Sequence, residues 1–388
     1  MVKKFLSATL IVVIIALALF FGVVPTLLDH LINRKLPGTP LEVEASTDAL
    51  HQTLFISDLH SDALLWGRNL SKAYNRGHTD IPRLIKGGVA LQGFSVVTKT
   101  PFGLNIERND DQSDMIFWLG LAQAWPPEAL GSLLKRAERM AAYLQSLAET
   151  QTDFFLIKSQ KDLQAYVETR KIDSAILAGW LTLEGAQALE GKLENLEVLY
   201  DAGFRMIAPT HFFDTEISGS AHGVNKGGLT DLGRQWVKAM EAKSMIIDLA
   251  HASTQTIDDI LAMATRPVMV SHTGVKGTCD NNRNLSDAQL KAIASQGGLV
   301  GIGFWPTAVC GESVDAIARS IEYTLKLIGA EHVALGSDFD GAVATPIDST
   351  EMDQLTQALL NRGIDGETIG KVMGGNVRDF LLANLPQS

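Results

Sequence analysis

The chain has 388 residues, of which 46% are hydrophobic, so it can bury a large core as one big domain or two ordinary ones. Its formal net charge of -11 argues against the basic face that a nucleic-acid partner requires, and we expect no such partner. The first predicted element is the apolar run Phe5 to Val24, which at about 20 residues suffices for one helical crossing of a bilayer.

Lys3 and Lys4 precede this run, so the positive-inside bias predicts a cytoplasmic N-terminus and an extracytoplasmic remainder, on the periplasmic or extracellular side. The alternative is a cleaved signal peptide, whose apolar region is usually ~7–15 residues long and ends at a small-x-small site. Here the run continues into Pro25 without such a site. We therefore favour an uncleaved membrane anchor over residues 1–25.

Residues 26–48 mix polar and charged residues with prolines, and we interpret them as a tether. From residue 49 to 388, β-type apolar runs alternate with helical patterns, which is typical of parallel βα units. Eight such strands close a (β/α)8 TIM-type barrel, so the predicted fold is this barrel preceded by one transmembrane helix. The expected strands lie near 54–58, 91–97, 176–183, 205–210, 245–249, 268–271, 299–304 and 333–337.

Helical patterns cover 114–124, 133–148, 193–202, 231–243, 254–264, 286–295 and 314–328. Ser286 and Gln289 have the spacing of a capping box. The apolar residues 154–157 are left over as a short extra strand or a lead-in to a helix. Residues 98–150 form the longest insertion, and we expect them to cover part of the barrel mouth.

Metal-ligating residue types recur at the ends of these strands. Side chains two apart on an extended segment point the same way, so His60 and Asp62 converge as a metal pair would. Catalytic groups of such barrels lie at the C-terminal strand ends. Any one of these residues has a structural explanation as a buried histidine or a helix cap. Their shared position predicts a binuclear metallohydrolase, whose candidate residues are His60, Asp62, Glu184, His211, His251, His272 and Asp338.

Ordered motifs then make the chain resemble the membrane dipeptidase (renal dipeptidase) family of zinc peptidases over roughly residues 49–380. They are Asp58-Leu-His60-Ser-Asp62, Asp80-Ile-Pro82-Arg-Leu, Leu183-Glu184-Gly185, Pro209-Thr-His211, Gly227-Gly-Leu229-Thr, Ile247-Asp248-Leu-Ala-His251-Ala-Ser253, Ser271-His272, Asn282-Arg283-Asn284 and Ser337-Asp338-Phe-Asp340-Gly341.

The resemblance implies two zinc ions. His60 and Asp62 would hold one, His251 and His272 the other, and Glu184 would bridge both. Two zinc ions ~3.5–4 Å apart can share a bridging water whose lowered pKa supplies hydroxide near neutral pH. The same ligands would accept other divalent ions.

The resemblance also implies roles in hydrolysis of the peptide bond of a dipeptide. His211 would contact the substrate and steady the developing oxyanion, and Asp338 would act as a catalytic acid and base. Arg283 would bind the C-terminal carboxylate through two parallel hydrogen bonds, although alone it would pass for a surface arginine. Family members often accept a D-residue at the second position and are often homodimers.

The two cysteines, Cys279 and Cys310, would pair in an extracytoplasmic domain, and the alternative is two unlinked thiols. The resemblance favours the disulfide, because some secreted family members have one in this region. Asp248 and Asp340 are candidates to orient the ligands, or they pair with nearby basic residues. His222 lies in a glycine-rich loop, where a histidine usually has no specific role.

Two other functions compete with this reading. An amidohydrolase-type barrel acting on cyclic amides or esters usually opens with His-x-His and bridges its metals with a carboxylated lysine. This chain has His-x-Asp and a glutamate, and Lys158, the one lysine at a strand-like end, is interpreted as a surface residue. A catalytically inactive, membrane-tethered binding protein should lack at least one ligand, and none is missing.

Overall fold

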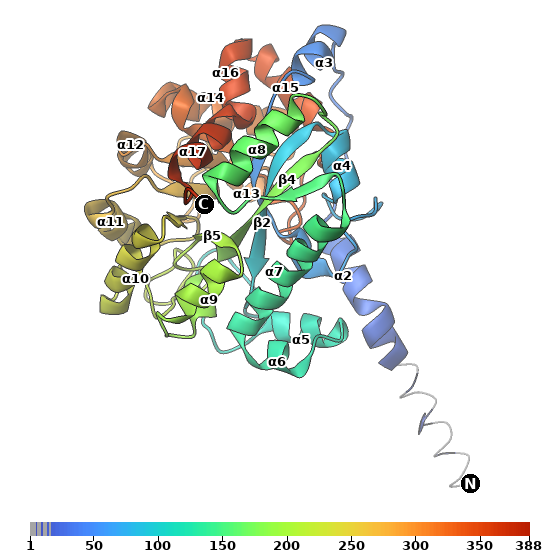
Figure 1. Cartoon of the computed structure of the whole chain (residues 1–388), viewed down its shortest axis with the longest axis vertical. Coiled ribbons are helices and arrows are strands. Elements are labelled where there is room, and N and C mark those ends of the chain that lie inside the picture. Colours follow the sequence, from blue (N-terminus) through green and yellow to red (C-terminus); the bar gives the residue numbers. More distant parts are fainter. Residues whose placement is uncertain (1–4, 6–8, 11–13, 15–16) are drawn as a thin grey trace.

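The computed structural model describes residues 5, 9–10, 14 and 17–388. Its centre is a curled, TIM-like sheet of parallel strands surrounded by helices (Figure 1). The strands are β1 (Ile56–Ser61), β2 (Val89–Val97), β3 (Phe154–Leu156), β4 (Leu177–Glu184), β5 (Phe204–Ile207), β6 (Ile246–Ile247), β7 (Met269–Thr273), β8 (Leu299–Ile302) and β9 (Val333–Leu335).

The strands are hydrogen-bonded in the order β6-β5-β4-β2-β1-β9-β8-β7. The two ends of this path meet at a single parallel bridge between Asp248 and Met269. All eight expected strands are confirmed. β1 starts and ends later than expected, so that His60 lies inside the strand. The leftover segment is the short extra strand β3, which pairs with β4.

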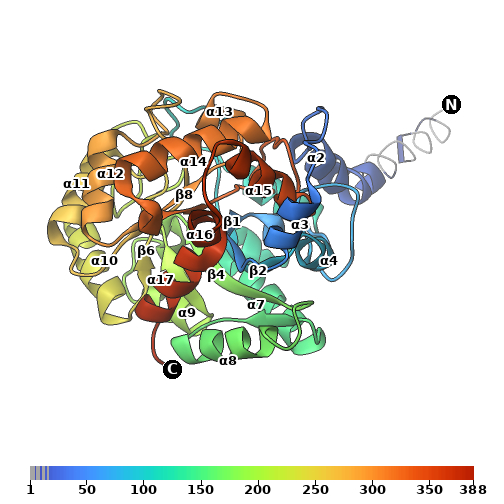
Figure 2. The ribbon, with the colours of Figure 1, turned by 90° about the horizontal axis from the view of Figure 1, so that it is seen from above.

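Helices enclose this sheet, as the view from above shows (Figure 2). They are α2 (Val24–Ile32), α3 (Ala45–His51), α4 (Ile81–Lys86), α5 (Met115–Ala122), α6 (Pro127–Gly131), α7 (Leu133–Thr150), α8 (Gln160–Arg170), α9 (Asn195–Asp201), α10 (Asp231–Ala242), α11 (Thr254–Met263), α12 (Asp287–Ser295), α13 (Pro306–Val309), α14 (Val314–Ile328), α15 (Met352–Asn361), α16 (Gly366–Gly370) and α17 (Asn376–Asn384).

Local sequence explains why these elements begin where they do. Every residue of β1, β2 and β4 is buried, as expected for strands of a parallel sheet that is covered on both faces. Side-chain caps start the helices that follow the strands. Ser253 accepts a hydrogen bond from the Thr256 N–H at the start of α11, and Ser286 and Gln289 form the predicted capping box of α12. These caps fix where each loop at the mouth ends.

The N-terminal segment differs from the prediction. Residues 26–48 are not a bare tether, because they include the end of α2 and bury Asp29, Asn33 and Thr47 against the barrel. Much of the apolar run Phe5 to Val24 lies outside the described residues. In the described part of the chain, no helix has both the length and the apolar character needed to cross a membrane. The N-terminal anchor therefore stays a prediction.

Candidate metal centre

The predicted metal ligands lie together at the C-terminal ends of the strands. His60 is near the end of β1, Glu184 is the last residue of β4 and His272 is on β7. Loops after β1, β5, β6 and β9 supply the other four candidates, which are Asp62, His211, His251 and Asp338. All seven side chains are buried. Positions far apart in the sequence thus meet at one mouth, as the strand-end argument predicted.

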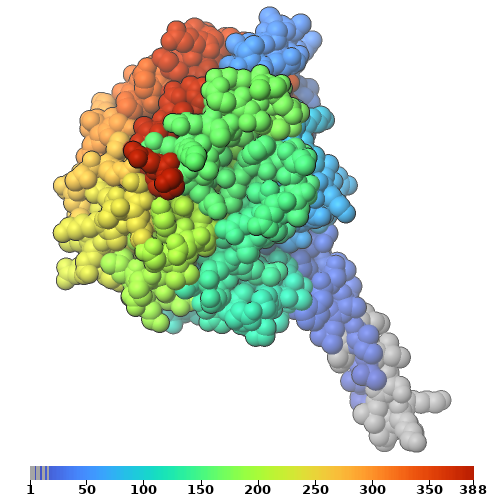
Figure 3. Space-filling view, in the orientation of Figure 1, coloured from blue at the N-terminus to red at the C-terminus, as the bar shows by residue number. Residues whose placement is uncertain are grey.

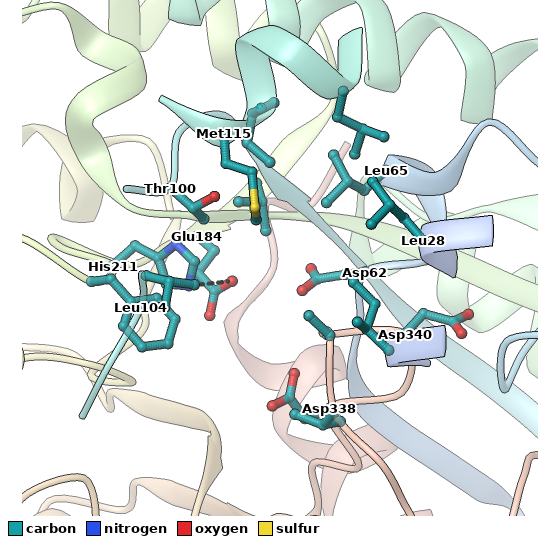
Figure 4. A pocket seen from close by; sticks show the side chains of 18 of the residues that line it. Leu28, Asp62, Leu65, Thr100, Leu104, Met115, Glu184, His211, Asp338 and Asp340 are labelled. Atoms are coloured by element: carbon teal, nitrogen blue, oxygen red, sulfur yellow. Dashed lines mark ion pairs between the residues drawn. The ribbon is translucent and has the colours of Figure 1, made fainter. Parts of the chain in front are cut away.

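Glu184 is the centre of this cluster. Its Oε1 lies 2.8 Å from Nε2 of His251 and 3.2 Å from Nε2 of His272. The same oxygen is 3.7 Å from Nε2 of His60, whose Nε2 is also 3.7 Å from Oδ1 of Asp62. Figure 4 shows the carboxylates of Glu184, Asp62 and Asp338 around one space. A single carboxylate therefore stands between the two predicted ligand pairs.

Three overlapping groups of residues have ligand atoms within 4.8 Å of one another. One is the predicted set of His60, Asp62 and Glu184. The other two are His60 with His272 and Asp338, and Glu184 with His211 and His251. His211 reaches Oε2 of Glu184 at 3.2 Å, drawn as a dashed line in Figure 4, whereas His251 and His272 face Oε1. The geometry thus admits His211 as a ligand as well as a substrate contact.

The chemistry of this donor set fits metal ions. Buried atoms of His60, Asp62 and Glu184 have no hydrogen-bond partner among the described residues, namely both ring nitrogens of His60, Oδ1 of Asp62 and Oε1 of Glu184. Leaving buried polar atoms unpaired is unfavourable by about 1–3 kcal/mol each. Carboxylate oxygens and imidazole nitrogens are zinc ligands, so divalent ions at this position would satisfy these atoms.

Burial disfavours the charged forms of the cluster when no metal is bound. It raises the pKa of Asp62 to about 8, with the charge of Asp340 adding to the effect. Burial likewise raises the pKa of Glu184 and of Asp338 well above the usual range for a carboxyl group. It lowers the pKa of His60 to about 3. A divalent cation at this position would favour the ionised carboxylates and neutral imidazoles that metal ligation requires.

A relay of hydrogen bonds orients His272. Asp248 accepts the Ser271 hydroxyl at 2.5 Å, and the Ser271 oxygen lies 2.9 Å from Nδ1 of His272. Asp248 also accepts backbone N–H groups of Ala250 and Ser271, which tie the end of β6 to β7. This arrangement supports the expectation that Asp248 orients a ligand, through Ser271.

Asp58 fixes the loop that carries Asp338, a role that its motif alone did not predict. The Ser337 N–H and hydroxyl both donate to Asp58 at 2.7 Å, so β1 holds the residue before Asp338. The backbone of Asp338 has a φ of 62° and that of His251 a φ of 61°, values that non-glycine residues rarely adopt. Such conformations are concentrated at functional sites, where the surrounding structure holds them.

Asp340 pairs with a basic residue, which is the second of the two roles considered for it. It pairs with Arg68, and it accepts hydrogen bonds from the backbone N–H groups of His78 and Thr79. Although burial opposes ionisation, Arg68 and His78 hold the pKa of Asp340 well below its usual range. Asp340 therefore fixes the loop that carries Asp338. Among the described residues it makes no hydrogen bond to a candidate metal ligand.

Arg283 is buried beside the cluster. Its Nη2 donates to the His272 carbonyl at 2.8 Å and lies 3.4 Å from Nε2 of His251, and its guanidinium lies over the Trp305 ring. No carboxylate of the described residues is within ion-pair distance of it. A buried guanidinium without an acidic partner suits a carboxylate of a ligand, so Arg283 is not the surface residue it would pass for alone.

A disulfide joins Cys279 to Cys310, with 5.2 Å between the Cα atoms. It connects the loop that carries Arg283 to the end of α13. Asn284 adds to this link, since its Nδ2 donates to the carbonyls of Cys279 and Ala308. The position of Arg283 thus depends on covalent and hydrogen-bonded restraints.

A cavity of about 480 Å³ is lined by every residue of the cluster except His60. As expected, the 98–150 insertion lines it, with Thr100, Leu104 and Met115 in Figure 4. His222 lines it too, which corrects our low expectation for this residue. Its ring is buried, 5.1 Å from that of His251, and its Nδ1 lies 2.8 Å from the Ile106 carbonyl oxygen. No local pattern marks it, because the insertion and β5 loop meet only in the folded chain.

Comparisons with known proteins agree with this geometry. A family model described as membrane dipeptidase (peptidase family M19) matches residues 44–380. Dipeptidase aclJ of Aspergillus oryzae is 26% identical over 397 residues, covering 97% of this chain and 87% of the fungal protein.

Two solved structures share the fold. One is a metallo peptidase from Rhodobacter sphaeroides liganded with a phosphinate mimic of the dipeptide L-Ala-D-Ala, with a TM-score of 0.66, 24% identity, and coverage of 86% of this chain and 99% of that chain. The other is an amidohydrolase from Pseudomonas aeruginosa, with a TM-score of 0.68, 20% identity, and coverage of 88% and 99%.

Proposed function

Because this chain belongs to the membrane dipeptidase family and is a metallo-dipeptidase, we propose that it hydrolyses dipeptides with two zinc ions held around Glu184. The observation that carries this proposal is the position of Glu184, whose Oε1 faces three imidazoles from three different strand ends. Its Oε1 lies near members of both predicted ligand pairs, and a carboxylate in such a position is the group that two neighbouring cations could share.

We assign His60 and Asp62 to one ion and His251 and His272 to the other. When bound, the ions supply Lewis acidity and a water of lowered pKa. We assign His211 to the substrate, because its side chain lines the cavity and its Nε2 lies 3.2 Å from Oε2 of Glu184, the oxygen that pairs with no other described histidine. From there its ring can donate a hydrogen bond to the carbonyl oxygen of the scissile bond as negative charge develops on it.

Asp338 is the group that moves protons. Its carboxyl lies at the pocket, with Oδ1 3.9 Å from Nε2 of His60, and burial raises its pKa well above the usual range. From this position the carboxyl group can take a proton from the attacking water and deliver it to the departing amine. The hydrogen bonds between Asp58 and Ser337 keep the loop in place for this transfer.

Arg283 limits the substrate to a dipeptide. It would bind the free carboxylate of the C-terminal residue through two parallel hydrogen bonds, at a fixed distance from Glu184. A longer peptide would have to place an amide where the carboxylate belongs. The cavity of about 480 Å³ is in the range of sites for small ligands. A D-residue at the second position is part of the proposal, supported by the L-Ala-D-Ala mimic bound to the Rhodobacter relative.

We further propose that the Phe5–Val24 run anchors the chain and that the barrel lies on the extracytoplasmic side. The length of the run and the preceding Lys3 and Lys4 support this topology. The disulfide between Cys279 and Cys310 supports it independently, because disulfides persist mainly in oxidising compartments.

The test is hydrolysis by the purified full-length chain, with and without chelator. We expect zinc-dependent cleavage of Gly-Ala, Ala-Ala and Ala-D-Ala, and little cleavage of Ala-Ala-amide or Ala-Ala-Ala. Cleavage of a cyclic amide or an ester in preference to dipeptides would favour the amidohydrolase alternative.

The structure offers no support for that alternative, because among the described residues that line the pocket there is no lysine that could be carboxylated as a bridge. Zinc binding without any hydrolysis would favour an inactive binding protein.

A further inference from the structure

Helix α2 forms one wall of the active-site cavity, although it precedes the region that the family model matches. Residues 17–22 are also helical, and a turn at Val23, whose N–H donates to the Leu19 carbonyl, joins them to α2. Four of its side chains line the cavity at a spacing of four residues, namely Phe20, Val24, Leu28 and Ile32. This spacing places them on one face of the helix.

Other side chains of the helix face solvent. Val23, Leu27 and Leu31 are 45%, 48% and 56% exposed and do not line the cavity. In the space-filling view, the segment leaves the rounded body beside α5, against which it packs (Figure 3). Leu28 is itself 38% exposed but lines the cavity, whereas Leu27 and Leu31 do not line it, so leucines of the same helix allow a matched comparison.

Buried polar contacts fix α2 to the catalytic side of the barrel. Asp29 is fully buried, and its Oδ2 lies 3.0 Å from Nε of Arg76 and 3.3 Å from Nε of Arg68. Arg68 in turn pairs with Asp340. One turn later, Asn33 accepts the Ala342 N–H at 2.9 Å. The helix is thus held against the loop that carries Asp338, so its cavity face is a built part of the pocket.

The wall lies across the cavity from Arg283. In the strand order, β6 and β7 stand at the two ends of the path. Arg283 contacts His251, which follows β6, and His272, which lies on β7. β1 stands in the middle of the path, and α2 packs against the 3₁₀ turn directly after it, near Leu65 in Figure 4. With its carboxylate at Arg283, as proposed above, a dipeptide would extend its amino-terminal residue toward α2.

We propose that α2 forms the subsite for the side chain of the amino-terminal residue, and that it makes the enzyme select dipeptides with a large apolar residue at that position. This inference rests on the proposed dipeptidase function and on the placement of the carboxylate at Arg283. Leu28 supplies apolar contact on the α2 side, with Leu65 beside it, and Met115 lines the same cavity.

The test measures kcat/KM of the full-length zinc-loaded chain for Phe-Ala, Gly-Ala and Ala-Phe. In the Leu28→Ala variant we expect the ratio of Phe-Ala to Gly-Ala to fall about tenfold, since a lost contact in an apolar pocket has an effect of this order. Leu28→Phe, which fills the subsite, should lower the same ratio. Leu27→Ala and Leu31→Ala, on the outward face, should leave it unchanged.

Three results would overturn the inference. They are an unchanged ratio in both Leu28 variants, an equal loss for all three dipeptides, and a loss confined to Ala-Phe, which would put the carboxyl-terminal residue at α2. Metal content and Tm, measured on each variant, separate a folding defect from a change of subsite. If the wild-type chain cleaves none of the dipeptides, the proposed function fails instead, independently of α2.

Discussion

Oε1 of Glu184 and Nε2 of His251 lie 2.8 Å apart, although burial disfavours the charged form of both groups. Burial raises the pKa of Glu184 well above its usual range and lowers that of His251 well below its usual range. An ordinary ion pair would shift both pKa values the other way. The pair is better explained as two ligands that need a shared cation, and the following predictions depend on this explanation.

Single substitutions should separate ligands from substrate contacts. His251→Ala and His272→Ala should each lose about one zinc per chain, because each removes a ligand of the same ion. His211→Ala should keep both ions and lose kcat about 10²–10³-fold, the usual effect of removing one oxyanion donor. Zinc per chain, measured by atomic emission after gel filtration, decides the assignment. Loss of zinc from the His211 variant, with zinc retained in the His272 variant, would show that His211 is the metal ligand and His272 the substrate contact.

Removing zinc should make stability depend on pH between about 6.5 and 8. Without metal, burial holds the pKa of folded Asp62 at about 8, whereas the unfolded carboxyl ionises near 4. Between these two pKa values the folded state binds more protons than the unfolded state. The contribution of Asp62 to the free energy of unfolding is therefore complete below pH 4 and is lost as pH rises to 8. The buried histidines have lowered pKa values, so they reduce the free energy of unfolding only as the pH falls below 6.5.

The measurement is Tm from pH 6.5 to 8 with chelator and with zinc. We expect a falling Tm only in the chelated sample, and a shallower fall in Asp62→Asn. A zinc-free protein whose Tm is constant or rises over this interval would show that the carboxylates are not protonated in the folded state.

Arg283 should act on the substrate carboxylate. Arg283→Lys keeps the charge but loses the paired hydrogen bonds, so we expect KM for Ala-Ala to rise at least tenfold. The variant should also discriminate less between Ala-Ala and Ala-Ala-amide. Arg234→Ala, at an exposed position of α10, is the control and should match the wild type. Full discrimination against the amide in the Arg283 variant would contradict the proposed contact.

The disulfide should support both stability and substrate binding. Its partners are 31 residues apart, and for a loop of this length the chain-entropy model predicts about 3–4 kcal/mol of stabilisation. The Cys279→Ser, Cys310→Ser double variant should therefore unfold at lower denaturant concentration and show a raised KM, because the loop carrying Arg283 is less restrained. Urea unfolding and dipeptide kinetics check the two effects. A raised KM without a change in the midpoint would limit the role of the disulfide to the loop.

The clustering of the candidate ligands could be predicted from sequence because strand ends carry a local signal. An apolar run that ends in His60 or Glu184 marks both the strand and the residue at its mouth, and a parallel barrel brings such ends together. The strands and most helices follow from the same periodicity. His222 carried no such signal, since its place at the pocket depends on the 98–150 insertion.

The α2 wall was not predictable in the same way. Residues 26–48 are polar enough to resemble a linker, and their burial depends on Asp29 meeting Arg68 and Arg76 from a distant loop. The position of Asp340 likewise depends on Arg68. Pairings between distant charged residues have no periodic pattern, so they emerge only from the folded structure.

The most direct test is a crystal structure of the zinc-loaded chain with anomalous diffraction at the zinc edge. Our account predicts two anomalous peaks that both contact Glu184, one beside His60 and Asp62 and the other beside His251 and His272. A single peak, or two peaks of which Glu184 contacts only one, would contradict the shared carboxylate on which the proposed mechanism depends.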